Sequence, residues 1–114
     1  MHKHLLTSAI GFAGVLALGM SSASAQDAER GHELFLSVGC YQCHGTVGQG
    51  SGAGARLAPD PLPYEAIRDY IRAPAQVMPP YEENVLSDSD VADIHAYLAT
   101  VPQPPALGET ILGE

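Results

Sequence analysis

Residues 40–44 read Cys40-Tyr41-Gln42-Cys43-His44, which is the pattern C-x-x-C-H. This pattern is the attachment signature of c-type haem. Two intervening residues separate the sulfurs so that each can form a thioether to one vinyl group of the same porphyrin. The histidine that follows can then present its imidazole to the iron. The motif therefore predicts one covalent haem c, attached through Cys40 and Cys43, with His44 as an axial iron ligand.

Other sites with similar cysteine spacing are disfavoured by the rest of the chain. A thioredoxin-like redox pair belongs to a βαβ context, and no strand pattern precedes Cys40. A zinc site needs a second pair of ligands, whereas the chain has only two cysteines and His32 and His95 stand far apart. A disulfide across two residues would close too small a loop to stabilise much. Haem attachment is the favoured interpretation.

The first 25 residues are expected to be a secretory signal peptide. A short basic start precedes the apolar stretch Leu5 to Met20, and Ala23-Ser24-Ala25 fits a cleavage site before Gln26. The apolar run is short for a membrane span, which needs about 20 residues, so cleavage is favoured over a retained anchor. We therefore expect a periplasmic protein with no stable membrane insertion after cleavage near Ala25-Gln26.

Removal of this segment leaves 89 residues (114 minus 25), enough for one small domain. We assign residues 26–105 to that domain and residues 106–114 to a C-terminal tail. The remaining chain has four arginines and thirteen acidic residues, which gives a formal charge of −9. This charge disfavours nucleic acid and anionic lipid as partners. The expected partner is a redox protein whose docking surface is basic or apolar.

Three segments carry helical periodicity and none carries a strand pattern, which predicts an all-α fold. The first runs from Asp27 to Val38, the second from Tyr64 to Ala73, and the third from an N-cap at Ser87 to about Thr100. Between the first two lies an aperiodic stretch from Gly45 to Pro63, unusually long for a compact domain. Such a loop is reasonable if it wraps a haem.

The second axial ligand is predicted to be Met78. It is the only methionine left after signal cleavage, and Pro79 and Pro80 stiffen its segment. A lone methionine is often core filler, but filler rarely occupies a polar, proline-flanked loop. The rivals are His32 and His95, which we interpret as surface or boundary residues. A methionine ligand favours electron transfer at a raised potential, whereas an open site favours ligand binding or catalysis.

The chain resembles the class I mono-haem bacterial cytochromes c across residues 28–101. The likeness rests on Gly31 and Phe35, Cys40-x-x-Cys43-His44-Gly45, Arg56-Leu57-Ala58-Pro59, Arg72-x-Pro74, Met78-Pro79-Pro80-Tyr81 and Ala96-Tyr97-Leu98. The resemblance implies a small cytochrome c fold in which three or more helices wrap one haem. It also implies that the first and last helices cross, with Gly31 against Tyr97 and Phe35 beside them.

In that family, the carbonyl of a loop residue before an Arg-Leu pair accepts the proton of the proximal imidazole. Relatives usually have proline there, and this chain has Ala55. Such a bond orients the ligand and tunes the iron. Arg56 and Arg72 are candidate partners for the haem propionates, because a buried carboxylate needs a charged partner. The alternative for both is an exposed arginine on an acidic protein.

The leading functional interpretation is an electron carrier that performs no chemistry on a substrate. The alternative is a dedicated electron-accepting cytochrome subunit of a periplasmic flavin or molybdenum dehydrogenase. A third interpretation, a five-coordinate haem sensor or peroxidase, requires Met78 to be absent from the iron. The sequence places no histidine or arginine beside Met78 to activate peroxide.

Overall fold

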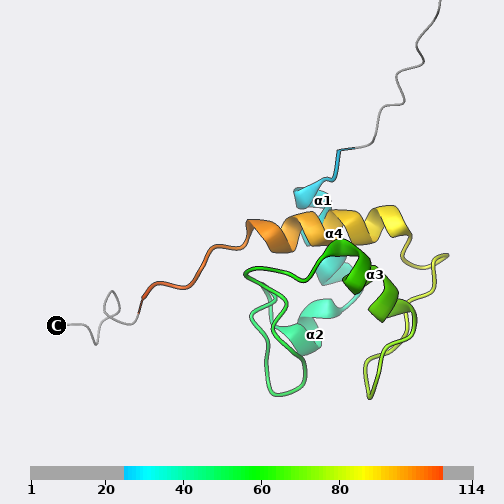
Figure 1. The fold of residues 1–114 in the computed structure, drawn as a ribbon, viewed down its shortest axis with the longest axis horizontal. Helices are drawn as coiled ribbons and strands as arrows, with labels where there is room; N and C mark the ends of the chain where they lie inside the picture. Colours follow the sequence, from blue (N-terminus) through cyan, green and yellow to red (C-terminus); the bar gives the residue numbers. More distant parts are fainter. Residues whose placement is uncertain (1–24, 107–114) are drawn as a thin grey trace, which may run out of the picture.

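The computed structural model describes residues 25–106, and within that range every regular element is a helix. Figure 1 shows their arrangement. The elements are α1 (Ala28–Ser37), α2 (Cys40–His44), α3 (Tyr64–Arg72) and α4 (Asp88–Thr100). The all-α prediction is confirmed. Most of the predicted signal peptide and nearly all of the predicted tail lie outside the described residues. No helix in the described range is long and apolar enough to cross a membrane.

The three predicted helices differ from the observed ones only by their capping residues. Asp27 is the N-cap of α1, and its side chain accepts hydrogen bonds from the backbone amides of Glu29 and Arg30. Val38 is the C-cap of the same helix. Ala73 is the C-cap of α3. Ser87 is the N-cap of α4, in a reciprocal capping box with Asp90. Local capping chemistry therefore sets these boundaries.

Helices α1 and α4 cross at Gly31, where their backbones touch. A Cβ atom built on Gly31 would lie 1.9 Å from the carbonyl oxygen of Asp93, so no residue with a side chain fits there without a backbone shift. The rings of Phe35 and Tyr97 pack beside the crossing with centroids 5.6 Å apart. Phe35 is completely buried. The predicted crossing of the first and last helices is confirmed, but the atoms nearest to the Gly31 Cβ position belong to the backbone of Asp93 and Ile94 rather than to the predicted Tyr97.

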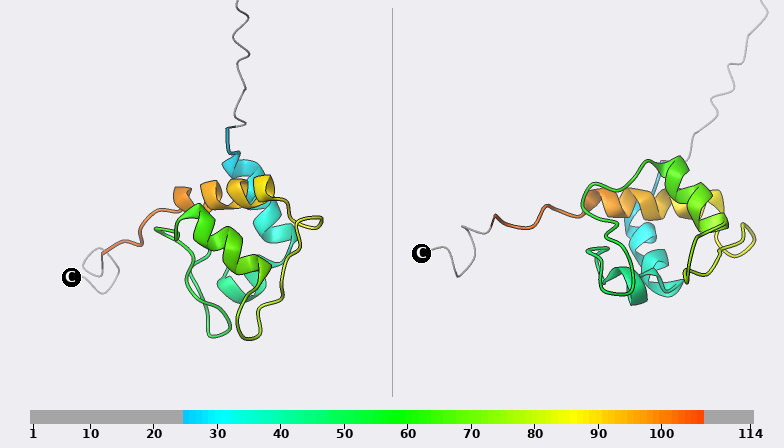
Figure 2. Two further views of the ribbon diagram at one scale, coloured as in Figure 1. Left: turned by 45° about the vertical axis from the view of Figure 1, so that its right-hand side comes forward. Right: turned by 60° about the horizontal axis from the view of Figure 1, so that its bottom comes forward.

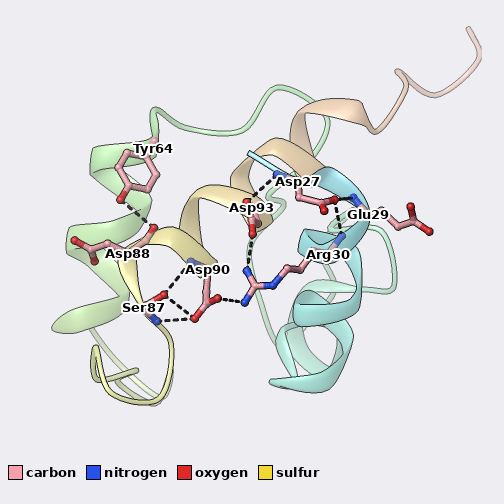
Figure 3. A network of polar contacts seen from close by, with 8 residues as sticks. All are labelled: Asp27, Glu29, Arg30, Tyr64, Ser87, Asp88, Asp90 and Asp93. Atoms are coloured by element: carbon pink, nitrogen blue, oxygen red, sulfur yellow. Dashed lines mark hydrogen bonds and ion pairs between the residues drawn. The ribbon is translucent and has the colours of Figure 1, made fainter. Parts of the chain in front are cut away.

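A polar network closes the N-terminal side of the same crossing (Figure 3). The amide of Asp27 donates to the Asp93 carboxylate at 2.8 Å. The Arg30 guanidinium bonds the same carboxylate at 2.5 Å and also pairs with Asp90. Asp93 is buried, so its charge needs these donors. The network therefore fixes the angle between α1 and α4 by hydrogen bonds as well as by packing.

The two long loops and α2 lie on the same side of α4 (Figures 1 and 2). The loop over residues 45–63 folds back on itself, because the amides of Leu57 and Ala58 both donate to the Gly48 carbonyl, at 2.7 and 2.9 Å. The loop over residues 73–87 connects α3 to α4. The helical layer thus supports two irregular segments, which carry Ala55 and Met78, around the C-x-x-C-H helix.

Candidate haem-binding site

The C-x-x-C-H motif forms its own short helix, α2. Gly39 precedes it with φ +89°, a left-handed conformation that turns the chain sharply out of α1. The i, i+3 spacing places Cys40 and Cys43 on one side of a helical turn. Both thiols are free, with Cys40 half-buried and Cys43 exposed. Helix α2 therefore offers two neighbouring thiols for attachment to one ligand.

The Cys40 thiol is half-buried, which affects its ionisation. Burial raises the pKa of Cys40 to about 11, whereas reactive thiols of C-x-x-C redox pairs have lowered pKa values. The described residues also contain no cluster of three or more histidine, cysteine or carboxylate side chains that could hold a metal ion. These two observations speak against the dithiol and zinc alternatives.

The His44 ring is oriented by the loop that follows it. Its Nδ1 lies 2.7 Å from the carbonyl oxygen of Ala55. A neutral imidazole that donates from Nδ1 leaves the Nε2 lone pair available for a metal. The loop approaches very closely, since a Cβ on Gly54 would lie 2.7 Å from the Cys43 carbonyl oxygen and 3.0 Å from His44 Nδ1. Ala55 therefore supplies the carbonyl, at the position where the resemblance led us to expect proline.

Met78 lies in the loop over residues 73–87, half-buried against the hydrophobic core. Tyr81 anchors this loop at two points. Its amide donates to the Ile71 carbonyl at 2.9 Å, and its hydroxyl donates to the Val38 carbonyl, also at 2.9 Å. Burial raises the pKa of Tyr81, and the neighbouring Cys40 and Cys43 contribute in the same direction. Because Val38 is two residues before Cys40, the Tyr81 hydroxyl ties the Met78 loop to the chain just before α2.

The apolar surface around these elements fits an apolar cofactor. The core formed by the described residues is small, and its largest fully buried side chains are Phe35, Val91 and Leu98. In contrast, several large hydrophobic residues of α2 and the two loops are exposed. They are Tyr41, Val47, Leu62, Val77 and Val85. A bulky apolar group held by α2 is expected to need such surface, so the residues present fit a covalent haem.

The two arginines predicted to pair with propionates have different surroundings. Arg56 is exposed and makes one long bond of 3.4 Å to the Pro59 carbonyl. Arg72 is half-buried and bonds the carbonyls of Tyr81 and Leu86, each at 2.8 Å, and the Asp88 carboxylate at 2.6 Å. The propionate role stays a prediction for both. The contacts of Arg72 were missed by sequence reasoning.

The rival histidine ligands have protein partners of their own. The His32 ring stacks on Tyr97 with centroids 4.5 Å apart. His95 Nε2 lies 3.1 Å from the Leu62 carbonyl oxygen, and its ring meets Tyr64 edge-on. These contacts favour the surface and boundary roles expected for both histidines.

Comparison with known proteins establishes the family. Residues 26–98 match the family model described as cytochrome C oxidase, cbb3-type, subunit III. The chain belongs to this cytochrome c family. It is a small c-type cytochrome, and its cofactor is covalently bound haem c. Electron transfer by that haem is the function the family supports.

A curated relative agrees with this assignment. The chain is 31% identical over 90 residues to the cytochrome bc1 complex cytochrome c subunit of Corynebacterium diphtheriae. The aligned region covers 76% of this chain and 32% of the relative, so the chain spans about a third of that relative's length. No solved structure matches the chain.

Proposed function

We propose that this cytochrome is a periplasmic electron carrier whose haem iron is bound by His44 and Met78 and cycles between Fe(II) and Fe(III). The observation that carries the proposal is the 2.7 Å bond between His44 Nδ1 and the Ala55 carbonyl, which prepares Nε2 for iron. The haem supplies the one-electron couple. The protein's own residues hold it and orient its ligands.

Each residue has a distinct task in this proposal. Cys40 and Cys43 fix the cofactor to α2, so that it cannot dissociate. His44 binds the iron through Nε2, because its Nδ1 is engaged with the Ala55 carbonyl. Met78 supplies a thioether, which stabilises Fe(II) relative to Fe(III) and so raises the potential. The mature chain has no second methionine to compete for this position.

Optical spectroscopy of Met78→Ala tests the axial ligation. We expect the oxidised wild-type protein to show the weak, long-wavelength absorption of a sulfur–iron(III) bond, and the variant to lack it. The control is Tyr70→Ala, because Tyr70 lies on α3, outside the apolar surface of α2 and the two loops, and is 49% exposed; this variant should retain the band. A wild-type protein that lacks the band and binds carbon monoxide readily when reduced would refute His/Met ligation.

A second candidate is a subunit of a larger redox complex. The Corynebacterium relative is named as a subunit of a bc1 complex, which favours this role. Purification from native membranes and periplasm under mild conditions separates the two candidates. A free monomer with a processed N-terminus at Gln26 supports the periplasmic carrier, whereas stable co-purification with a larger redox protein supports the subunit.

A further inference from the structure

Arg72 lies at the end of α3, where its guanidinium meets the Met78 loop and the start of α4. Nη1 donates to the carbonyls of Tyr81 and Leu86, each at 2.8 Å, and Nη2 bonds the Asp88 carboxylate at 2.6 Å. Tyr81 is three residues after Met78, and Leu86 precedes the N-cap of α4. One side chain thus joins the two ends of the segment that follows Met78.

We propose that Arg72 is a positioning residue that holds the Met78 loop closed and thereby keeps the thioether on the iron. This rests on the proposed ligation by Met78. The loop has no regular structure of its own over residues 73–87, so its order depends on such anchors. A thioether is a weak ligand, and its bond persists only if the loop rarely opens.

The carbonyl contacts carry most of the effect. Hydrogen bonds from a charged donor are stronger than neutral ones, and the Arg72 side chain is only 23% exposed. The ion pair with Asp88 contributes less, because the Asp88 side chain is 46% exposed and water screens it. The second anchor, the Tyr81 hydroxyl on the Val38 carbonyl at 2.9 Å, ties the same part of the loop to α1.

The inference differs from the predicted pairing of Arg72 with a propionate. Three of the guanidinium's N–H groups are already directed at protein acceptors, out of the five that an arginine carries. A role in positioning the loop affects the lifetime of the Met78–iron bond. A role in propionate pairing affects instead how the redox potential changes with pH. The two roles are therefore separable by measurement.

The test is competition between Met78 and added imidazole in the oxidised holoprotein. Loss of two charge-assisted bonds should make the loop open more often, so Arg72→Gln should bind imidazole about tenfold more tightly than wild type. Arg72→Lys keeps the charge and should recover part of this difference. The control is Arg68→Gln, because Arg68 is on the same helix and its contacts, with Asp69 and with the Tyr64 ring, lie within α3; the imidazole affinity of this variant should change less than twofold.

Tyr81→Phe gives an independent measurement if Arg72→Gln does not fold. It removes only the hydroxyl bond to Val38 and should tighten imidazole binding about threefold. Unchanged imidazole affinity in the folded Arg72 variant, with the sulfur–iron(III) band present in wild type, overturns the inference. A shift only in the pH dependence of the potential also overturns it, in favour of propionate pairing. Absence of the band from wild type overturns the proposed function itself.

Discussion

Gly31 has no side chain, and this sets the distance between α1 and α4. A methyl group there would meet the Asp93 carbonyl oxygen at 1.9 Å, far inside van der Waals contact. Because the clash is with backbone, a change of rotamer cannot relieve it. The neighbouring Phe35 and Tyr97 rings are packed for this distance, so separating the helices would also open the core.

Gly31→Ala is therefore expected to destabilise the holoprotein by at least about 2 kcal/mol, the cost of overpacking a tight site. The better helix propensity of alanine offsets at most about 1 kcal/mol of this cost. Guanidinium or thermal unfolding measures the difference. Gly52→Ala is the control, since no atom lies within 4 Å of a Cβ at Gly52, and its stability should stay within about 0.5 kcal/mol of wild type. Equal stability of both variants would show that the crossing is looser than described.

Asp90 receives hydrogen bonds from two directions at the start of α4. The pKa of the Asp90 carboxyl is lowered below its usual value, mainly by the hydrogen bond from the Arg30 guanidinium and secondly by the one from the Ser87 hydroxyl. A carboxyl whose pKa is lower in the folded than in the unfolded state stabilises the fold at high pH. That contribution is complete above the unfolded-state pKa of about 4, and it is lost as pH falls through the lower folded-state pKa.

We expect Asp90→Asn to flatten the decline of thermal stability between neutral pH and about pH 3. The variant should be less stable than wild type at pH 7 and nearly equal to it at the acid end. Asp69→Asn serves as the control, because Asp69 is 69% exposed and pairs with its sequence neighbour Arg68. Parallel melting curves for wild type and Asp90→Asn across this pH range would contradict the prediction.

At the scale of elements, residues with local partners were predictable from sequence. Asp27 and Ser87 bond amides two or three residues away, so the cap and the helix start can be recognised in a short window. The cysteine motif was recognisable for the same reason, because its chemistry lies within five residues. Its helical conformation was not predicted, since five residues show too little periodicity.

Contacts with backbone acceptors far along the chain were not predictable. Arg72 bonds the carbonyls of Tyr81 and Leu86, nine and fourteen residues away. Every residue has a backbone carbonyl, so the residue types at these two positions do not indicate that their carbonyls accept hydrogen bonds from Arg72. The Asp93 bonds to Asp27 and Arg30, across more than sixty residues, are hidden in the same way. The Ala55 carbonyl was identified only because a family resemblance indicated its position.

At the scale of the whole molecule, charge distinguishes this cytochrome from one that docks through a basic surface. Four arginines against thirteen acids remain if the predicted signal is cleaved, and two of the arginines, Arg30 and Arg72, are engaged in ion pairs with aspartates of the α4 segment. The resulting negative field attracts cations and repels anions over roughly a Debye length, about 8 Å at physiological ionic strength.

Small redox reagents of opposite charge can measure this field directly. Electron transfer from the reduced protein to a cationic cobalt(III) complex should slow as salt is added, because screening removes an attraction. Transfer to anionic ferricyanide should accelerate, because screening removes a repulsion. The opposite signs make each reagent a control for the other, since a general effect of salt on the fold would move both rates together. If both rates are independent of ionic strength, electron transfer takes place outside the acidic field, and the docking surface is then apolar rather than complementary to a basic partner.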